Sequence, residues 1–103
     1  MCKQLDDEFL EMARRFKLKA GSTMAFTLMQ NLQLTVANVG DSSAMLLKKS
    51  GEVQKLTVDQ TPGRSDEYNR IVRNNGFVTM RDNVARVDGS LAVSRAIGDI
   101  QHK

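Results

Sequence analysis

Apolar residues recur at the spacing of one helix face near the start of the chain. Acidic residues stand near the beginning of this segment and basic residues near its end, which complements a helix dipole. The pattern predicts a helix over residues 3–18. Its apolar face contains Leu5, Phe9, Met12, Ala13 and Phe16.

Short apolar and β-branched runs separated by polar turns follow the glycine at position 21. Residues 24–30 and 32–39 are separated by a polar pair, which predicts a hairpin. Residues 43–49 and 52–58 predict a third and a fourth strand, and strands this close in sequence favour antiparallel pairing. We expect the apolar side chains of the first two strands to form the core together with Phe9 and Phe16.

A second helix is predicted after Pro62-Gly63, in the segment 65–76. Ser65 is the expected N-cap, Ile71 and Val72 the expected apolar face, and Gly76 the expected stop. Two short β-like runs then surround residues 81–83, and the remaining residues show no clear period. These elements predict one α+β domain over residues 1–103, with antiparallel β-sheets and flanking helices.

Composition narrows the class of protein only slightly. A length of 103 residues suits a single domain, and a hydrophobic fraction of 41% with a charged fraction of 26% is ordinary for a globular protein. No apolar run approaches the roughly 20 residues that cross a bilayer, and the acidic, amphipathic start does not resemble a secretory signal. We therefore expect no membrane partner and an intracellular location, cytoplasmic or nuclear.

The net charge of +3 leaves two interpretations of the basic residues in segment 14–19. The cluster could contact phosphate, as in a nucleic-acid-binding protein, or it could be the solvated face of a helix. The aromatic and motif signals of nucleic-acid binders are missing, so the solvated face is the favoured interpretation. No nucleic-acid partner is expected.

Aspartates at predicted strand ends and turns are the candidate functional side chains. Carboxylate oxygens suit hard cations such as Mg²⁺ and Mn²⁺, and short side chains at strand ends can hold them. Each of these aspartates can equally be a turn residue that accepts a backbone N–H. The sequence pattern leaves both alternatives open for Asp41, Asp59, Asp82, Asp88 and Asp99.

An ordered set of motifs covers nearly all of residues 20–103. The motifs are "GST" (21–23), "VANVGDSSA" (36–44), "LTVDQTP" (56–62) followed by Glu67 and "RI" (70–71), and "RVDGSLAVSRAIGD" (86–99). In order and separation this set resembles the central segment of the metal-dependent type-2C serine/threonine protein phosphatases.

The resemblance implies a fold, a reaction and a role for one residue. The family has a β-sandwich of two antiparallel sheets with helices outside, so this chain is expected to form part of that sandwich. Two Mn²⁺ or Mg²⁺ ions activate a water that attacks the phosphorus of phosphoserine or phosphothreonine in phosphoprotein substrates. The aspartate of the family's Gly-Asp-Ser motif matches Asp41, which the resemblance assigns as a ligand of an additional metal ion.

The resemblance also implies that much of the family's metal centre lies outside this chain. The early Asp-Gly-His-Gly segment would precede Met1, and the later Asp-Gly-x-x-Asp and Asp-Asn segments would follow Lys103. We therefore expect a truncated phosphatase domain that is inactive alone and binds no metal tightly. The alternative is a non-catalytic phosphatase-like module that binds or regulates a partner.

Three positions depart from the family pattern. Ser43 stands where Arg is usual, Gln60 where His is usual, and Asn75 where a second glycine is common; the first two put local polar contacts in doubt. Asn tolerates positive φ nearly as well as Gly, so the third change is mild.

Strands that lack their neighbours present free edges. We expect a homodimer or larger assembly, joined by strand edges or by exchange of a terminal segment.

Overall fold

The computed structural model describes residues 2–103. Its helices are α1 (Cys2–Phe16), α2 (Ser65–Arg73) and the short 3₁₀ helix η1 (Ile100–His102). The strands form four antiparallel pairs, and each pair is a separate two-stranded sheet. They are β1 (Gly21–Ser22) with β8 (Ile97–Gly98), β2 (Met24–Gln30) with β3 (Gln33–Val39), β4 (Met45–Leu47) with β5 (Val53–Lys55), and β6 (Val78–Arg81) with β7 (Val84–Val87).

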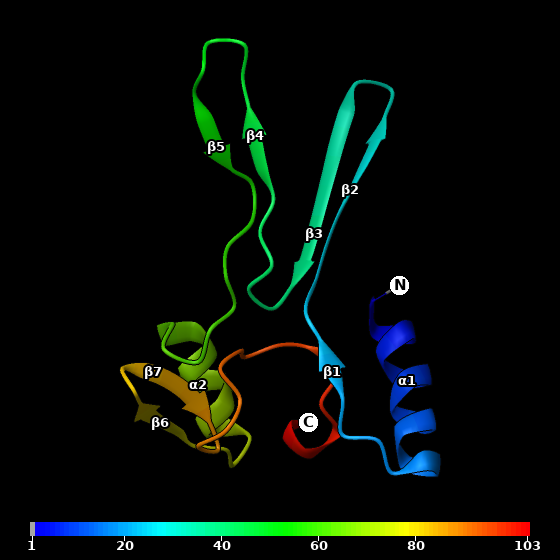
Figure 1. Ribbon diagram of the computed structural model, residues 1–103, viewed down its shortest axis with the longest axis vertical. Coiled ribbons are helices and arrows are strands. Elements are labelled where there is room, and N and C mark those ends of the chain that lie inside the picture. Colours follow the sequence, from blue (N-terminus) through cyan, green and yellow to red (C-terminus); the bar gives the residue numbers. More distant parts are fainter. Residues whose placement is uncertain (1) are drawn as a thin grey trace.

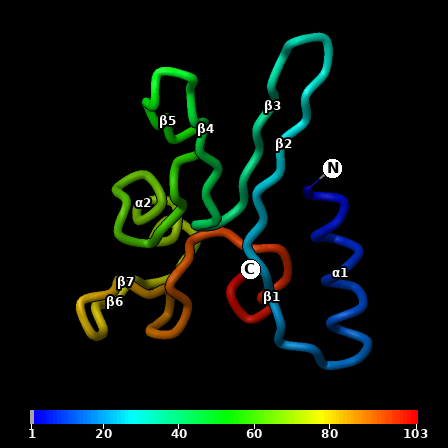
Figure 2. The backbone as a smooth tube through the Cα atoms, turned by 45° about the horizontal axis from the view of Figure 1, so that its top comes forward, coloured from blue at the N-terminus to red at the C-terminus, as the bar shows by residue number. Residues whose placement is uncertain are grey.

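The predicted α+β class with antiparallel strands is confirmed, and the two long hairpin strands fall close to their predicted limits. The hairpins β2–β3 and β4–β5 project in the same direction from a base that contains α2, β6–β7 and the β1–β8 pair (Figure 1). Helix α1 lies on the other side of β1 from α2, and a view turned by 45° shows the same arrangement (Figure 2). No helix within residues 2–103 has the length and apolar character needed to cross a membrane.

Two hairpin turns share one backbone conformation. Asn31 and Leu32 both have positive φ (50° and 63°), and so do Asp82 and Asn83 (52° and 62°). Two consecutive residues of positive φ form the type I′ turn, whose twist matches that of antiparallel strands. The predicted β-like runs around residues 81–83 are therefore the strands β6 and β7.

The end of α2 confirms the interpretation of Asn75. Its φ is 65°, and its N–H donates to the carbonyl of Val72 at 3.1 Å. The N–H of Gly76 donates to the carbonyl of Ile71 at 3.0 Å, which completes a Schellman motif. The start of α2 differs from the prediction, because Arg64 in extended conformation is the N-cap and Ser65 is already helical.

The predicted core is wrong in its main part. The buried apolar side chains are Leu10, Ala13, Ile71 and Val87, with Pro62 fully enclosed. Phe16 is 62% exposed, Val72 is also exposed, and the outer half of the β2–β3 hairpin carries exposed leucines and methionine. Along both strands burial decreases from the base of the hairpin to its turn, and no second layer covers the outer half within the described chain.

Candidate functional site

Asp41 lies directly after β3, at the base of the β2–β3 hairpin. Gly40, which precedes it, is buried and has a φ of 90°, a conformation that favours glycine. A Cβ at position 40 would lie 2.9 Å from the carbonyl oxygen of Arg95 and would also meet Thr23. This close approach ends the strand and turns the chain, so that the Asp41 side chain is exposed.

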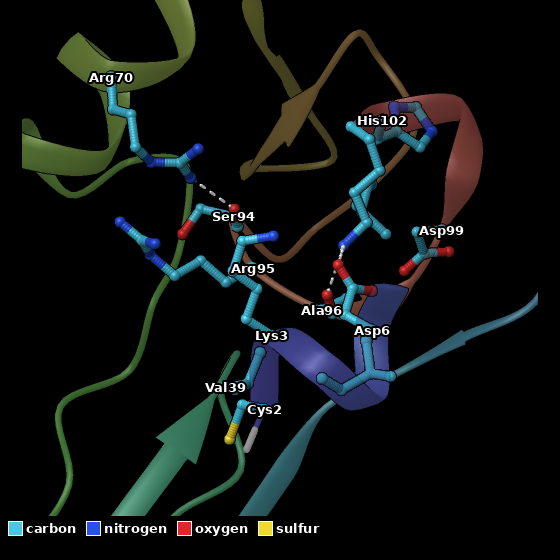
Figure 3. A pocket seen from close by; sticks show the side chains of 13 residues that line it. Cys2, Lys3, Asp6, Val39, Arg70, Ser94, Arg95, Ala96, Asp99 and His102 are labelled. Atoms are coloured by element: carbon cyan, nitrogen blue, oxygen red, sulfur yellow. Dashed lines mark hydrogen bonds and ion pairs between the residues drawn. The ribbon is translucent and has the colours of Figure 1, made fainter. Parts of the chain in front are cut away.

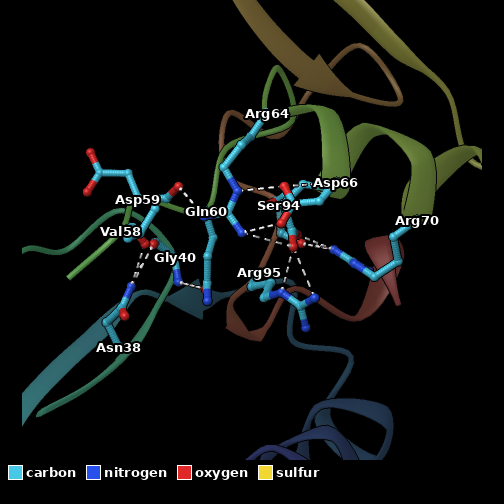
Figure 4. Close-up of polar contacts among 11 residues, drawn as sticks. Asn38, Gly40, Val58, Asp59, Gln60, Arg64, Asp66, Arg70, Ser94 and Arg95 are labelled. Atoms are coloured by element: carbon cyan, nitrogen blue, oxygen red, sulfur yellow. Dashed lines mark hydrogen bonds and ion pairs between the residues drawn. The ribbon is translucent and has the colours of Figure 1, made fainter.

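The backbone of Gly40 is held from both sides by Gln60. The N–H of Gly40 donates to Gln60 Oε1 at 2.7 Å, and the N–H of Gln60 donates to the Gly40 carbonyl at 2.9 Å (Figure 4). Asn38 Nδ2 donates to the Val58 carbonyl at 3.1 Å and to the Gly40 carbonyl at 3.3 Å. The turn before Asp41 is thus fixed against the segment that follows β5.

The residues after Asp41 are anchored in the same way. The hydroxyls of Ser42 and Thr23 share a hydrogen bond of 2.7 Å, and Ser43 Oγ donates to Asp59 Oδ1 at 3.1 Å. Ser43 and Gln60, the two residues that depart from the family pattern, therefore both make local polar contacts.

A buried carboxylate, Glu67, lies below this turn. Its side chain is 3% exposed and is surrounded by three guanidinium groups. Arg70 Nη2 donates to Glu67 Oε2 at 2.8 Å, and Arg95 donates to Glu67 Oε1 from Nε at 3.1 Å and Nη2 at 3.0 Å. Arg64 Nη2 lies 3.8 Å from the same Oε1.

These donors decide the protonation of Glu67. Burial alone raises the pKa of a carboxyl group because it disfavours the charged form. The hydrogen bonds from Arg70 and Arg95 outweigh burial and hold the pKa of Glu67 below its usual range. Glu67 is therefore an anion at neutral pH and balances charges that come from two distant parts of the chain.

The loop containing Ser94 and Arg95 links this ion cluster to the Asp41 turn. The N–H of Ser94 donates to the Gln60 carbonyl at 3.0 Å, and its own carbonyl accepts from Arg70 Nη2 at 2.7 Å. Glu67, Ser94 and Gln60 thus form a continuous polar path from α2 to Gly40. We call this path, with Arg70, Arg95 and Gly40, the polar hub.

The remaining candidate aspartates either pair with other side chains or lie in turns. Asp59 accepts from Lys55 and Ser43, and these hydrogen bonds lower its pKa. Asp82, Asp88 and Asp99 all have left-handed backbone conformations, as turn residues do. Within residues 2–103, no three His, Cys, Asp or Glu side chains come together in a way that could hold a metal ion. The metal role of Asp41 stays a prediction that its position at the turn permits.

A cavity of about 360 Å³ opens between α1 and the Ser94–Arg95 loop (Figure 3). It is lined by charged groups of both signs, among them Asp6, Arg70, Arg95 and Lys103. Lys103 Nζ donates to Asp6 Oδ2 at 3.0 Å and to the Ala96 carbonyl at 2.8 Å, which ties the end of the chain to α1. Asp41 does not line this cavity, so the hollow and the candidate metal ligand are separate features.

Comparison with known proteins identifies the class of this chain. The family model of protein phosphatase 2C matches residues 1–103. The chain is 43% identical over 101 residues to "Protein phosphatase 1F" of Rattus norvegicus, and the match covers 98% of this chain and 22% of the rat protein. It is 43% identical over 98 residues to "Probable protein phosphatase 2C 2" of Arabidopsis thaliana, covering 95% of this chain and 25% of that protein.

Solved structures agree with the sequence matches. "Structure of a C.elegans sex determining protein" has a TM-score of 0.88 at 25% identity, covering 97% of this chain and 25% of that one. A phosphatase from a pathogenic strain of Toxoplasma gondii has a TM-score of 0.63 at 43% identity, covering 66% of this chain and 20% of that one. This chain belongs to the protein phosphatase 2C family. It spans about a fifth to a quarter of the length of these relatives.

Part of the polar hub escaped sequence reasoning. Glu67 and Arg70 lie three residues apart in α2, so their contact on one helix face is predictable from the sequence. Arg95 is 28 residues from Glu67 and Ser94 is 24 residues from Arg70, and nothing in the spacing predicts these contacts.

Proposed function

We propose that this chain is the central segment of a metal-dependent serine/threonine phosphatase domain and that it has no phosphatase activity alone. One observation carries the proposal: the separate family motifs converge on the polar hub, which fixes the backbone of Gly40 directly before Asp41. Residues 36–44, 56–62 and 86–99 contribute to the hub through Gly40, Gln60 and Arg95. A scaffold that holds one exposed carboxylate is suited to present it to a metal ion.

Asp41 is the proposed ligand of an additional Mn²⁺ or Mg²⁺ ion. When bound in a complete domain, such ions lower the pKa of a coordinated water and neutralise phosphoryl charge, which is the chemistry needed to hydrolyse phosphoserine or phosphothreonine. The contribution of this chain is to orient the carboxylate through Gly40 and Gln60. A single exposed carboxylate cannot replace the waters of these ions, so we expect only weak metal affinity from the chain itself.

A direct assay tests the proposed inactivity. The purified chain, incubated with Mn²⁺ and a phosphoserine peptide, is expected to release no phosphate above a protein-free control. Turnover by the unmodified chain that is lost in Asp41→Ala would overturn this part of the proposal. Micromolar Mn²⁺ binding in a calorimetric titration would contradict the weak affinity.

A chimera tests the catalytic origin of the segment. The matching 101 residues of the rat relative are replaced by this chain, and Mn²⁺-dependent phosphate release is measured. We expect an active chimera whose activity falls in Asp41→Ala and is preserved in Asp82→Asn, a change in an exposed hairpin turn. A chimera that has the melting temperature of the rat protein but no phosphatase activity would favour the alternative, a phosphatase-like module that binds or regulates a partner.

Self-association is a further part of the proposal. The hairpins β2–β3 and β4–β5 are each isolated two-stranded sheets, which are marginal in water unless further strands or layers cover them. We expect the chain to form a homodimer, and light scattering coupled to size exclusion measures this directly. Phosphoprotein substrates belong to the proposed parent enzyme, and neither nucleic acid nor membrane is proposed as a partner. An intracellular location, cytoplasmic or nuclear, completes the proposal.

A further inference from the structure

The turn that ends α2 contains the only asparagine of this chain that precedes a glycine. The asparagines are Asn31, Asn38, Asn69, Asn74, Asn75 and Asn83, and glycine follows Asn75 alone. Asparagine is a thermolabile residue, because the backbone nitrogen of the next residue can attack its side-chain amide carbon. A side chain on that next residue hinders the attack, and glycine has none. Asn75-Gly76 is therefore the pair of this chain most prone to the reaction.

The cap of α2, at the junction with β6 (Figure 1), constrains both residues of this pair. Asn75 has a φ of 65°, a left-handed conformation that asparagine and glycine adopt readily. A Cβ at position 76 would lie 2.8 Å from Ile71 Cγ2 and 3.2 Å from the Ile71 carbonyl oxygen, so glycine is the residue that fits there. The conformation that closes the helix therefore places asparagine directly before glycine.

The same cap shields the attacking nitrogen. The Gly76 N–H donates to the Ile71 carbonyl at 3.0 Å, and the Asn75 N–H donates to the Val72 carbonyl at 3.1 Å. The Gly76 nitrogen must lose its proton and approach the Asn75 side chain, and the hydrogen bond to α2 opposes both steps. The reaction therefore requires the end of α2 to open. Proteins open locally in this way without global unfolding.

The residue after β7 restrains the cap from the other side. The Phe77 N–H donates to Asp88 Oδ1 at 3.1 Å, and the Asp88 N–H donates to the Phe77 carbonyl at 2.8 Å. A Cβ at position 76 would lie 3.6 Å from the same Asp88 Oδ1, so this carboxylate is close to Gly76. A negative charge there also disfavours loss of the Gly76 proton. Asp88 thus helps to keep the cap closed.

We propose that Asn75 is a site of spontaneous deamidation and that opening of the α2 cap sets its rate. The Gly76 nitrogen forms a bond to Asn75 Cγ, and the side-chain nitrogen leaves as ammonia with the proton that Gly76 loses. Water then opens the cyclic succinimide at either carbonyl, which gives aspartate or isoaspartate at position 75. Water is consumed and ammonia is released, and no oxidant or reductant takes part. The proposal is independent of the phosphatase function and of self-association.

Either product weakens the cap irreversibly. Aspartate adds a negative charge at the C-terminal end of a helix, where the helix dipole disfavours it and the Asp88 carboxylate is already close. Isoaspartate adds a methylene to the backbone, so the hydrogen bond from Gly76 to Ile71 loses its geometry. Glu67 and Arg70 lie on the same helix, so a loosened end of α2 also weakens the support of the polar hub.

Peptide mapping by mass spectrometry, after incubation in mildly alkaline buffer, tests the site. The folded chain is compared with the chain unfolded in guanidinium. We expect conversion at Asn75 in both, at least about tenfold slower in the folded chain because the cap must open first. Asn31 and Asn83 are internal controls, since both also have positive φ but precede branched side chains, and little conversion is expected at either. Asn75→Gly keeps the turn and removes the reactive amide.

Two variants of Asp88 test whether cap opening sets the rate. Asp88→Gly removes the acceptor of the Phe77 N–H and tolerates the φ of 50° at this position. Asp88→Asn removes the charge but keeps an oxygen acceptor, and mapping reports conversion at position 88 separately. Amide hydrogen exchange at Gly76, followed by NMR, measures opening. We expect Asp88→Gly to raise exchange at Gly76 and conversion at Asn75 by the same factor, and by more than Asp88→Asn does.

Each part of the proposal has an outcome that would overturn it. No conversion at Asn75 in the unfolded chain would overturn the site. Equal rates in the folded and the unfolded chain would overturn protection by the cap. Constant conversion in Asp88→Gly, with faster exchange at Gly76, would overturn control by cap opening. The deamidated chain, separated by ion exchange, is expected to unfold at a lower guanidinium concentration than the unmodified chain, and an unchanged midpoint would contradict the loss of the cap.

Discussion

The polar hub and the outer half of the β2–β3 hairpin belong to the same strands and have opposite environments. At the base, Gly40, Gln60 and Glu67 are fixed by backbone and side-chain hydrogen bonds that link residues far apart in the chain. At the far end, Leu28 and Met29 are 55% and 74% exposed. The difference shows that contacts between distant segments fix the base of the hairpin, while the apolar side chains of its outer half are exposed in this chain.

The largest effect is expected from removing the centre of the hub. Glu67→Ala leaves Arg70 and Arg95 without their shared carboxylate, and breaking a buried ion pair costs about 3 to 5 kcal/mol. The arginines are partly exposed, with side-chain exposures of 39% and 45%, so solvent screening reduces the expected loss to about 3 kcal/mol. Urea unfolding followed by circular dichroism measures it.

Asp66→Ala is the matched control for this change. Asp66 is the neighbouring carboxylate and pairs with Arg64 at 2.6 Å, but its side chain is 63% exposed. Its removal is expected to cost much less than the removal of Glu67. Equal losses in the two variants would show that burial does not distinguish the hub from the surface.

The turn before Asp41 is expected to be nearly as sensitive. Gly40→Ala places a methyl group 2.9 Å from the Arg95 carbonyl oxygen in a backbone with a φ of 90°, and we expect a loss of about 2 to 3 kcal/mol. Gly51 has a φ of 87° with no atom within 4 Å of the same position. Gly51→Ala therefore carries the backbone strain alone, about 1 kcal/mol. The melting temperatures of the two variants measure this difference. Equal melting temperatures would show that close packing at Gly40 does not stabilise the turn.

Apolar side chains are buried in the base and exposed in the outer hairpin, and this contrast predicts a smaller difference in the free energy of unfolding between variants. Ile71 is 6% exposed, so Ile71→Ala should destabilise the chain by about 2 kcal/mol, at the low end for buried aliphatic residues because the core is small. Leu28→Ala removes a side chain that is already exposed and should change the stability of the monomer by less than about 0.5 kcal/mol. Denaturation at low protein concentration, where association is absent, compares them. A larger loss for Leu28→Ala would place the core in the hairpin.

The smallest effect concerns pH. Because the pKa of Glu67 is lowered in the folded chain, its contribution is present above the usual glutamate pKa of about 4.3 and is lost as pH falls through the folded value. The difference in stability between the unmodified chain and Glu67→Gln should therefore shrink as the pH is lowered from neutral to below about 4.3. Urea midpoints at several pH values measure this difference. A constant difference across that range would contradict a charged, hydrogen-bonded Glu67.

Local sequence features determined much of this protein. The periodicity of segment 3–18, the short apolar and β-branched runs of segment 24–39 and the Asn75-Gly76 stop act over a few residues, and each produced the expected helix, hairpin or cap. The motif set also determined the family, because residue order and separation are properties of the sequence itself.

Only the tertiary structure decided which apolar residues are buried and what surrounds Asp41. Apolar residues of a strand or a helix face become buried only under a covering layer, and Phe16 and Leu28 remain exposed because none lies over them in the described chain. The contacts of Glu67 with Arg95 and of Gly40 with Gln60 join residues 28 and 20 positions apart. Such contacts depend on how loops meet in space, which no local pattern specifies.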